Sequence, residues 1–218
     1  MQRLKWRIVT ARRRFVSRVV QGAWRAIQTA GQVSPGTVEA DKFREFGFGS
    51  VMTFPQGSVF NQKWIAIGED TLIAEQVTMS AGLGPGHQLG PDTVLRIGDR
   101  CVIGRGSHIV AHENIDIADD VWTGPYVYIT DQNHGYADTE TPIGRQIPVN
   151  RPVSIGAGSW LGAGSIVLPG ARIGRNVVVA GGSVVRGEIP DHCVVAGVPA
   201  KIIRQHTEAG WGPAVTAV

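Results

Sequence analysis

Residues 154–187 read SIGAGS WLGAGS IVLPGA RIGRNV VVAGGS VVRG, and this stretch repeats with a period of six. Each unit has an aliphatic residue in its second place, then a residue that is mostly small, and a small or β-branched residue in its sixth place. The aliphatic residues stay in step for six consecutive units: Ile155, Leu161, Val167, Ile173, Val179 and Val185. This repeat decides the fold.

Each unit is long enough for one very short strand and one corner, so three units, about 18 residues, complete a triangular turn. The aliphatic residue points inward, and backbone groups pair between stacked turns. Glycine and asparagine at corners, such as Gly162 and Asn176, supply conformations that other residues resist. The same period starts at Ile65, with breaks at the Gly/Pro-rich loop 82–93 and near Glu113. The sequence predicts an all-β domain, a parallel β-helix of hexapeptide repeats, over residues 46–200.

Composition limits the remaining possibilities. The chain has 218 residues, 43% of them hydrophobic, which suits one well-buried domain with a short appended segment. The two cysteines, Cys101 and Cys193, lie far apart with no secretory signal, so we expect a reducing, cytoplasmic compartment. No run of residues approaches the ~20 apolar residues of a membrane span.

The first 28 residues form a separate pattern. Their apolar residues recur at helical spacing, at Leu4, Ile8, Phe15, Val19, Ala23 and Ile27. Five arginines fall in one stripe on the opposite side: Arg3, Arg7, Arg14, Arg18 and Arg25. A linker rich in Gly, Ser and Pro follows, so residues 1–45 are predicted to be an amphipathic α-helix and its linker, and residues 201–218 a C-terminal tail.

Two interpretations of this helix remain open. It resembles an interfacial membrane anchor, which would make the protein peripheral at the inner face of the membrane. Alternatively, its apolar face packs on the coil or on other subunits.

All eight basic residues of this segment precede the first acid, Glu39, and the remainder of the chain is net acidic. Because the positive charge is one segment and not a surface spread through the fold, nucleic acid is not an expected partner.

Three stretches carry a family resemblance: ITDQNH at 129–134, SWLGAGSIVLPG at 159–170 and AGVPAK at 196–201. With them, residues 117–204 resemble the hexapeptide-repeat acyltransferases, particularly the group similar to maltose and galactoside O-acetyltransferases. The resemblance implies a left-handed coil and a homotrimer whose active sites lie between two coils. It also implies an acyl-CoA co-substrate, acetyl-CoA being the expected donor.

The resemblance places the catalytic histidine at His134, where the repeat breaks and the polar loop 133–151 begins. An acceptor hydroxyl is a weak nucleophile, so a base must take its proton as it attacks the thioester. An imidazole, with an ordinary pKa near 6.5, is suited to that step. Neither cysteine lies in a nucleophile motif, so we expect a direct displacement in a ternary complex.

By position in the matching motifs, Ala163 and Gly181 fall where family members contact the pantetheine of CoA. Lys201 and Arg204 fall where two arginines of the family reach the nucleotide phosphates. Arg186 is also expected to contact CoA, but it departs from the family pattern. It stands where the family often has Thr, and Gly187 replaces the usual following Lys.

The acceptor is expected near Asp131, Asn133 and Trp160. Asp131 is a candidate either to orient the histidine or to bind an acceptor hydroxyl. Trp160 is a candidate aromatic wall for a sugar or for pantetheine, or a contact with a neighbouring chain. The family's sugar-acetylating members use an Asn on a preceding coil, where this sequence has Ser107 and His108.

The leading hypothesis is an acyl-CoA-dependent O-acyltransferase, most simply an acetyltransferase, acting on a glycan, a glycolipid precursor or a similar acceptor. One alternative is a metal-dependent lyase similar to the γ-carbonic anhydrases. His108 and His112 are four positions apart, whereas that family separates its close pair by five, so no metal is expected. The other alternative is a non-catalytic β-helix that serves as an assembly scaffold.

Overall fold

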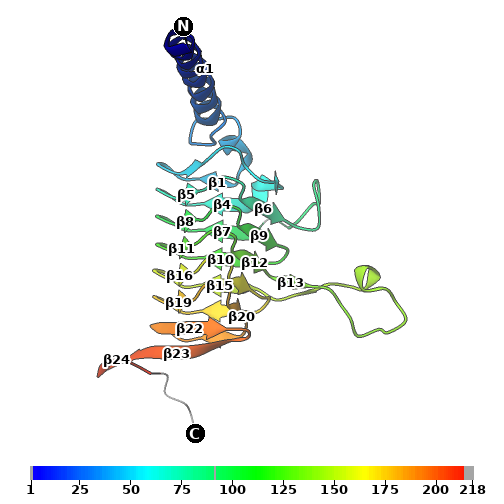
Figure 1. Ribbon diagram of the computed structural model, residues 1–218. Coiled ribbons are helices and arrows are strands. Elements are labelled where there is room, and N and C mark those ends of the chain that lie inside the picture. The colour runs from blue at the N-terminus through cyan, green and yellow to red at the C-terminus, as the bar shows by residue number, and fades with distance from the viewer. Residues whose placement is uncertain (1, 91, 214–218) are drawn as a thin grey trace.

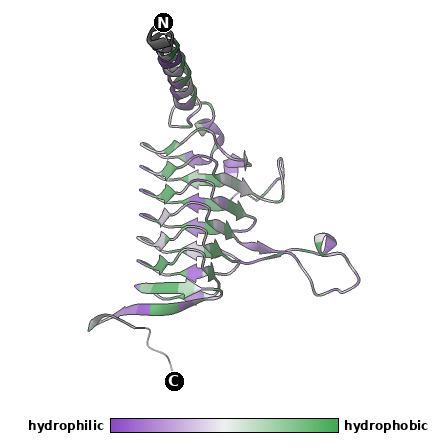
Figure 2. Cartoon of the chain, in the orientation of Figure 1, coloured by the Kyte–Doolittle hydropathy of each residue, from purple (hydrophilic) through white to green (hydrophobic). Residues whose placement is uncertain are grey.

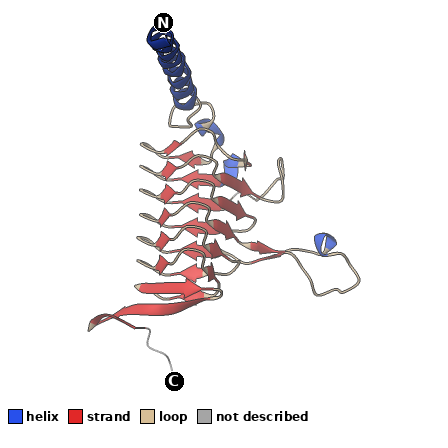
Figure 3. Ribbon diagram, in the orientation of Figure 1, coloured by secondary structure: helices blue, strands red, loops and turns tan. Residues whose placement is uncertain are grey.

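Three parallel sheets run along the sides of a coil, which Figures 1 and 3 show as a column of stacked turns. The structure is a computed structural model that describes residues 2–90 and 92–213. Through the coil, successive strands pass from sheet 1 to sheet 2 to sheet 3, so each circuit adds one strand to each sheet. The parallel β-helix predicted from the hexapeptide period is confirmed.

The strands are short and follow one another in a fixed order. Sheet 1 contains β1 (Glu45–Phe46), β4 (Ile65–Ile67), β7 (Leu95–Ile97), β10 (Ile115–Ile117), β15 (Val153–Ile155), β18 (Arg172–Ile173) and β21 (Glu188–Ile189). Sheet 2 contains β2 (Val51–Met52), β5 (Leu72–Ile73), β8 (Val102–Ile103), β11 (Trp122–Thr123), β16 (Trp160–Leu161), β19 (Val178–Val179), β22 (Cys193–Gly197), β23 (Ala200–Thr207) and β24 (Gly210–Pro213). Sheet 3 contains β3 (Val59–Phe60), β6 (Thr78–Ala81), β9 (His108–Ala111), β12 (Tyr128–Thr130), β17 (Ile166–Val167) and β20 (Val184–Val185).

Aliphatic side chains fill the inside of the coil and keep register from turn to turn. Ile155 lies beside Ile173, and Leu161 beside Val179, each pair 18 residues apart. All six aliphatic residues of the repeat in residues 154–187 are buried, as predicted. Full burial of one such side chain contributes about 1.5–3 kcal/mol. Strands of two or three residues are too short to be stable alone, so the fold depends on this stacking.

Longer turns account for the breaks in the sequence period. One insertion lies between β6 and β7, and extra residues at the corner 112–114 lengthen the next turn. The largest is the arm, residues 132–150, inserted between β12 and β15. Its strands β13 (Gln132–Asn133) and β14 (Val149–Asn150) pair antiparallel, and Figure 1 shows it extending away from the coil. Each insertion leaves at a corner, so the stacking of the turns is preserved.

The C-terminal segment differs from the predicted tail. β23 pairs antiparallel with β22, and β24 pairs antiparallel with β23, so residues 200–213 continue sheet 2. The six-residue spacing is already broken after Val185, since the next buried aliphatic residue, Ile189, follows four positions later. Residues 200–203 alternate between half-buried and exposed, and Ile202 packs against the core. This hairpin covers the open edge of the last turn, an edge that would otherwise expose unpaired backbone groups. Residues 214–218 lie outside the described part of the chain.

The predicted N-terminal helix is confirmed as α1 (Gln2–Ala30), and Figure 1 shows it projecting beyond the first turn. The residues that follow its end contact the coil: Val33 bridges Met52, and the side-chain amide of Gln56 donates to the Gly31 carbonyl at 2.8 Å. Large apolar side chains of the helix remain exposed, including Phe15 at 67%. Packing of this face on the chain's own coil, one part of the second interpretation, is therefore wrong. Within the described residues, no helix is both long and apolar enough to cross a membrane.

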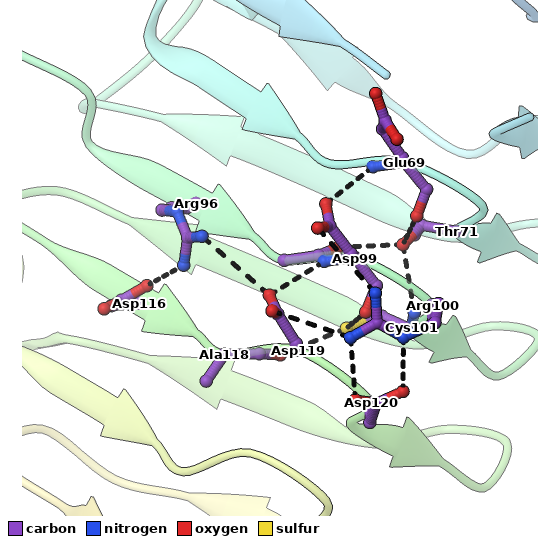
Figure 4. A network of polar contacts seen from close by, with 11 residues as sticks. Glu69, Thr71, Arg96, Asp99, Arg100, Cys101, Asp116, Ala118, Asp119 and Asp120 are labelled. Atoms are coloured by element: carbon purple, nitrogen blue, oxygen red, sulfur yellow. Dashed lines mark hydrogen bonds and ion pairs between the residues drawn. The ribbon is translucent and has the colours of Figure 1, made fainter. Parts of the chain in front are cut away.

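Carboxylates at the corners bind the backbone of the neighbouring turn (Figure 4). Asp99 accepts a hydrogen bond from the Glu69 N–H at 2.8 Å, and Asp119 accepts one from the Asp99 N–H at 3.0 Å. Asp120 forms two hydrogen bonds with the Arg100 guanidinium, at 2.8 and 2.9 Å, and these lower the pKa of Asp120.

Three short 3₁₀ helices complete the fold: Ala40–Lys42, Gln62–Trp64 and Ile143–Arg145.

Candidate active site

His134 stands at the base of the arm, directly after β13. Asn133 faces Val149 across the antiparallel pair, and the chain then turns outward. Gly135 lies where the two sides of the arm approach closely, since a Cβ there would be 2.6 Å from the Ile147 carbonyl oxygen. Both Asn133 and His134 are exposed to solvent. A paired strand before His134 and a closely packed glycine after it thus fix the backbone at a place where the imidazole is exposed.

A groove of about 1110 Å³ separates the base of the arm from the outer surface of the last turns. The arm side contributes Asn133 and His134, and the coil side contributes Arg186, so three of the residues predicted from sequence share this groove. Arg151 and Arg172 also line it, although the sequence analysis did not single them out. Two features of the sequence could have pointed to these arginines. Arg172 occupies the outward place of a hexapeptide unit, and Arg151 ends the loop that begins at Asn133. The groove combines an imidazole with three cations and with the carboxylate of Glu188, which lies 3.5 Å from the Arg172 guanidinium.

Asp131 is buried and does not face the groove. Its carboxylate accepts hydrogen bonds from three successive backbone N–H groups, those of residues 112, 113 and 114, at 2.7–2.8 Å. The backbone carbonyl of Asp131 accepts the Arg151 N–H at 2.7 Å. The residue just before the arm is thus hydrogen-bonded to the residue just after it. With 0% of its surface exposed, Asp131 has no access to a substrate, which corrects the predicted contact with an acceptor hydroxyl. Asp131 fixes the corner from which the arm leaves.

His112 lies at this same corner. Burial lowers its pKa below the ordinary value, the nearby His87 and His134 act in the same direction, and Asp131 opposes them. Its Nδ1 is buried without a hydrogen-bond partner among the described residues. No group of three or more His, Cys, Asp or Glu side chains within residues 2–90 and 92–213 is arranged to hold a metal ion.

The residues expected to contact CoA lie in two further places. Ala163 and Gly181 stack on successive turns at the corner between sheets 2 and 3, where the Gly182 N–H donates to the Ala163 carbonyl at 2.9 Å. A Cβ on Gly162 would lie 2.5 Å from the Gly181 nitrogen, so position 162 of this corner has no room for a side chain. Lys201 and Arg204 are exposed on β23. The structure thus brings the expected pantetheine contacts together and the expected phosphate contacts together.

Trp160 is separated from His134 within one chain. It is 52% exposed on the outer face of sheet 2, directly beside Trp122 on the preceding turn. A smaller hollow of about 350 Å³ adjoins these two indoles, and His134 does not line it. A shared site for Trp160 and His134 is therefore not formed by the single chain.

Comparison with known proteins identifies the family to which this coil belongs. A profile described as bacterial transferase hexapeptide (six repeats) matches residues 152–187. The galactoside O-acetyltransferase of Escherichia coli K12 is 32% identical over 143 residues, which cover 62% of this chain and 68% of that protein. The chain belongs to the hexapeptide-repeat acetyltransferase family. Another relative is a putative lipopolysaccharide biosynthesis O-acetyl transferase, WbbJ, of E. coli K12, which is 42% identical over 106 residues.

That match covers 45% of this chain and 54% of WbbJ. A probable acetyltransferase of Mycobacterium tuberculosis is 40% identical over 117 residues, which cover 54% of this chain and 39% of that protein. The chain thus spans about half or less of the length of these two relatives. Among solved structures, AntD, an N-acyltransferase from Bacillus cereus in complex with dTDP and coenzyme A, shares the fold at a TM-score of 0.67 and 18% identity. The superposition covers 82% of this chain and 92% of AntD.

We predict that Asp131→Ala destabilises the protein by about 3 kcal/mol, because three part-buried N–H groups lose their acceptor at once. Denaturant unfolding of the two proteins measures the difference. Asp116→Ala is the matched control, since Asp116 is a half-exposed carboxylate whose partner is Arg96, and it should change stability by less than about 1 kcal/mol. Equal losses in the two variants would contradict the assigned role of Asp131.

Proposed function

We propose that the chain is an acyl-CoA-dependent O-acyltransferase that moves an acetyl group to a hydroxyl of a glycan, a glycolipid precursor or a similar acceptor. The observation that carries the proposal is the exposed imidazole of His134 in a groove, on a chain of an acetyltransferase family. The likeness to a galactoside O-acetyltransferase supports a hydroxyl acceptor. A cytoplasmic location is part of the proposal, since both cysteines are free thiols, as in a reducing compartment.

In this proposal His134 acts as the general base. It takes the proton of the acceptor hydroxyl while the oxygen attacks the thioester carbonyl, and a backbone N–H stabilises the resulting oxyanion. The carbon–sulfur bond then breaks, and the proton held by the imidazole leaves with the CoA thiolate. Neither cysteine competes as a nucleophile, because burial raises the pKa of Cys101 to about 11 and also raises that of Cys193.

The donor is proposed to lie along the corner of Ala163 and Gly181, with Lys201 and Arg204 near its phosphates. The small residues of that corner leave its backbone accessible to the pantetheine amides, and both basic side chains are exposed. Arg186 lines the groove of His134 and is proposed to contact the donor there. Asn133, next to His134 in the groove, is proposed to bind the acceptor.

A homotrimer completes this proposal. The outward column of sheet 1 is polar, with Arg96, Asp116, Ser154, Arg172 and Glu188. The outward column of sheet 2 is apolar, with Leu72, Val102, Trp122, Trp160 and Val178. Figure 2 shows the same contrast, with purple segments on sheet 1 and mostly green or white strands on sheet 2. A neighbouring copy would cover the apolar column and could bring its own Trp160 to the groove of His134, which supports a site shared between chains.

We expect His134→Asn to retain the fold and CoA affinity but to lower acetyl transfer by about 10²-fold or more, the ordinary contribution of a general base. Mass spectrometry of acetylated products, with acetyl-CoA and a panel of galactosides and glycolipid precursors, measures the rate. His192→Asn is the control, because His192 lies outside the groove and has a positive φ of 56° that asparagine tolerates. Unchanged transfer by His134→Asn would remove the base assignment, and failure of the wild-type protein to bind any acyl-CoA would favour the scaffold alternative.

Replacement of both Lys201 and Arg204 by alanine should weaken CoA binding more than dephospho-CoA binding, because the group that distinguishes the two ligands is a phosphate. Calorimetric titration of both ligands gives the two ratios. A double variant with Lys42→Ala and Lys63→Ala, two exposed lysines at the opposite end of the coil, should leave both affinities unchanged. Equal losses for CoA and dephospho-CoA would contradict a contact with that phosphate.

The proposed trimer predicts a molar mass three times the chain mass of 23.3 kDa. Light scattering after gel filtration at micromolar concentration measures it. Trp122→Lys, in the centre of the apolar column, should shift the protein toward monomer, because it places a charge where a neighbouring chain would bury it. Arg96→Lys on the polar column is the control. A monomeric wild-type protein would contradict the shared site.

A further inference from the structure

The projecting part of α1 carries a broad apolar surface that no other described element covers. Eight large apolar side chains of the helix are between 46% and 69% exposed: Trp6, Val9, Phe15, Val16, Val19, Val20, Trp24 and Ile27. Projected at 100° per residue, they span an arc of about 180°. Soluble proteins rarely leave a continuous apolar surface of this extent in water, and such a surface indicates a partner.

The same helix is strongly basic. Arg14, Arg18 and Arg25 are exposed and project within about 40° of one another, on the side away from the apolar arc. Arg12 and Arg13 are exposed too, and no acidic residue occurs before Glu39. The partner must therefore offer both an apolar interior and negative charge.

We propose that α1 lies along the surface of a bilayer that carries anionic headgroups, with its apolar arc at the boundary of the acyl chains. Trp24 projects at the edge of the arc, where an indole can contact apolar chains while its N–H remains near the headgroups. Arg12 and Arg13 project within the arc, and the long apolar stem of each lets its guanidinium reach the phosphates. The helix stands clear of the coil, so its length is accessible to a flat surface (Figure 1).

A second copy of the chain is a poorer occupant for this arc. Side-by-side helices that bury apolar surface ordinarily set acidic against basic side chains along their edges. Here every charged residue of α1 is basic, so copies of the helix repel one another, whereas anionic lipid attracts each of them. In the proposed trimer, three helices would act together on one membrane and strengthen a weak individual attraction.

The test is co-sedimentation of the full-length protein with vesicles, without acyl-CoA or acceptor, so that its outcome does not depend on the proposed transfer reaction. We expect binding to vesicles of phosphatidylcholine with phosphatidylglycerol at low salt, and at least tenfold weaker binding to phosphatidylcholine alone or at high salt. Replacing both Arg14 and Arg18 by glutamine should weaken binding to the anionic vesicles by at least about 30-fold, given about 1 kcal/mol for each basic residue lost from one helix.

A second pair of variants separates insertion from simple charge attraction. Phe15→Ser with Val19→Ser should weaken binding at least tenfold at unchanged charge. Ser17→Ala with Gln21→Ala, at the same spacing on the polar side of the helix, should bind like the wild-type protein. Three outcomes would overturn the proposal: wild-type protein that stays in the supernatant with anionic vesicles at low salt, equal binding by the Phe15 and Val19 double variant, or a change of molar mass in that variant, which would assign the arc to contacts between copies.

Discussion

The stacking of one buried aliphatic side chain on the next, with backbone hydrogen bonds between turns, is the interaction on which the rest of the structure depends. Strands β16 to β20 contain two residues each, so none of them is stable without the turns on either side. A shift by one residue would turn every aliphatic side chain outward. The six-residue period is therefore kept through the plain turns of 18 residues. It breaks where residues leave the coil, and also between Val185 and Ile189, where the last turn is two residues shorter.

Because each turn contacts only its neighbours, the coil accepts insertions at its corners without losing register. Ile117 pairs with Ile155 across the whole arm, as directly as Ile155 pairs with Ile173 across one plain turn. The corner at the arm is closed by Asp131, whose carboxylate binds three backbone N–H groups. Asp99, Asp119 and Asp191 bind single backbone N–H groups at other corners. His134, three residues after Asp131, thus stands on a base held by the same kind of contact that closes ordinary turns.

The sequence was sufficient for whatever depends on periodicity. The inward residues of the coil, the N-terminal helix and the position of the arm all follow from spacing, because each has a fixed geometric period or a clear break in one. The role of Asp131 does not, since an acid at a corner looks the same in sequence whether it is solvated or buried against another turn. Arg151 and Arg172 were missed because their approach to His134 depends on the path of the arm, which has no period. The hairpin of β23 and β24 was missed because its alternation is short and its pairing with β22 is antiparallel, unlike the rest of the coil.

Side chains fill the interior of the coil, so a ligand site in this fold must be built outside it, from insertions, termini and outer faces. In this chain those parts are chemically distinct: an arm with an exposed imidazole, a basic terminal strand, one apolar outer column and one charged column. The apolar column lies on the outer face of sheet 2, whereas the arm leaves the corner between sheets 3 and 1, which is why Trp160 and His134 are separated within one chain. A triangular coil cannot bend to bring them together, because its packed core fixes the three faces relative to one another. A site that used both side chains would therefore need a second copy of the chain, because the rigidity that positions each of them also keeps the two apart.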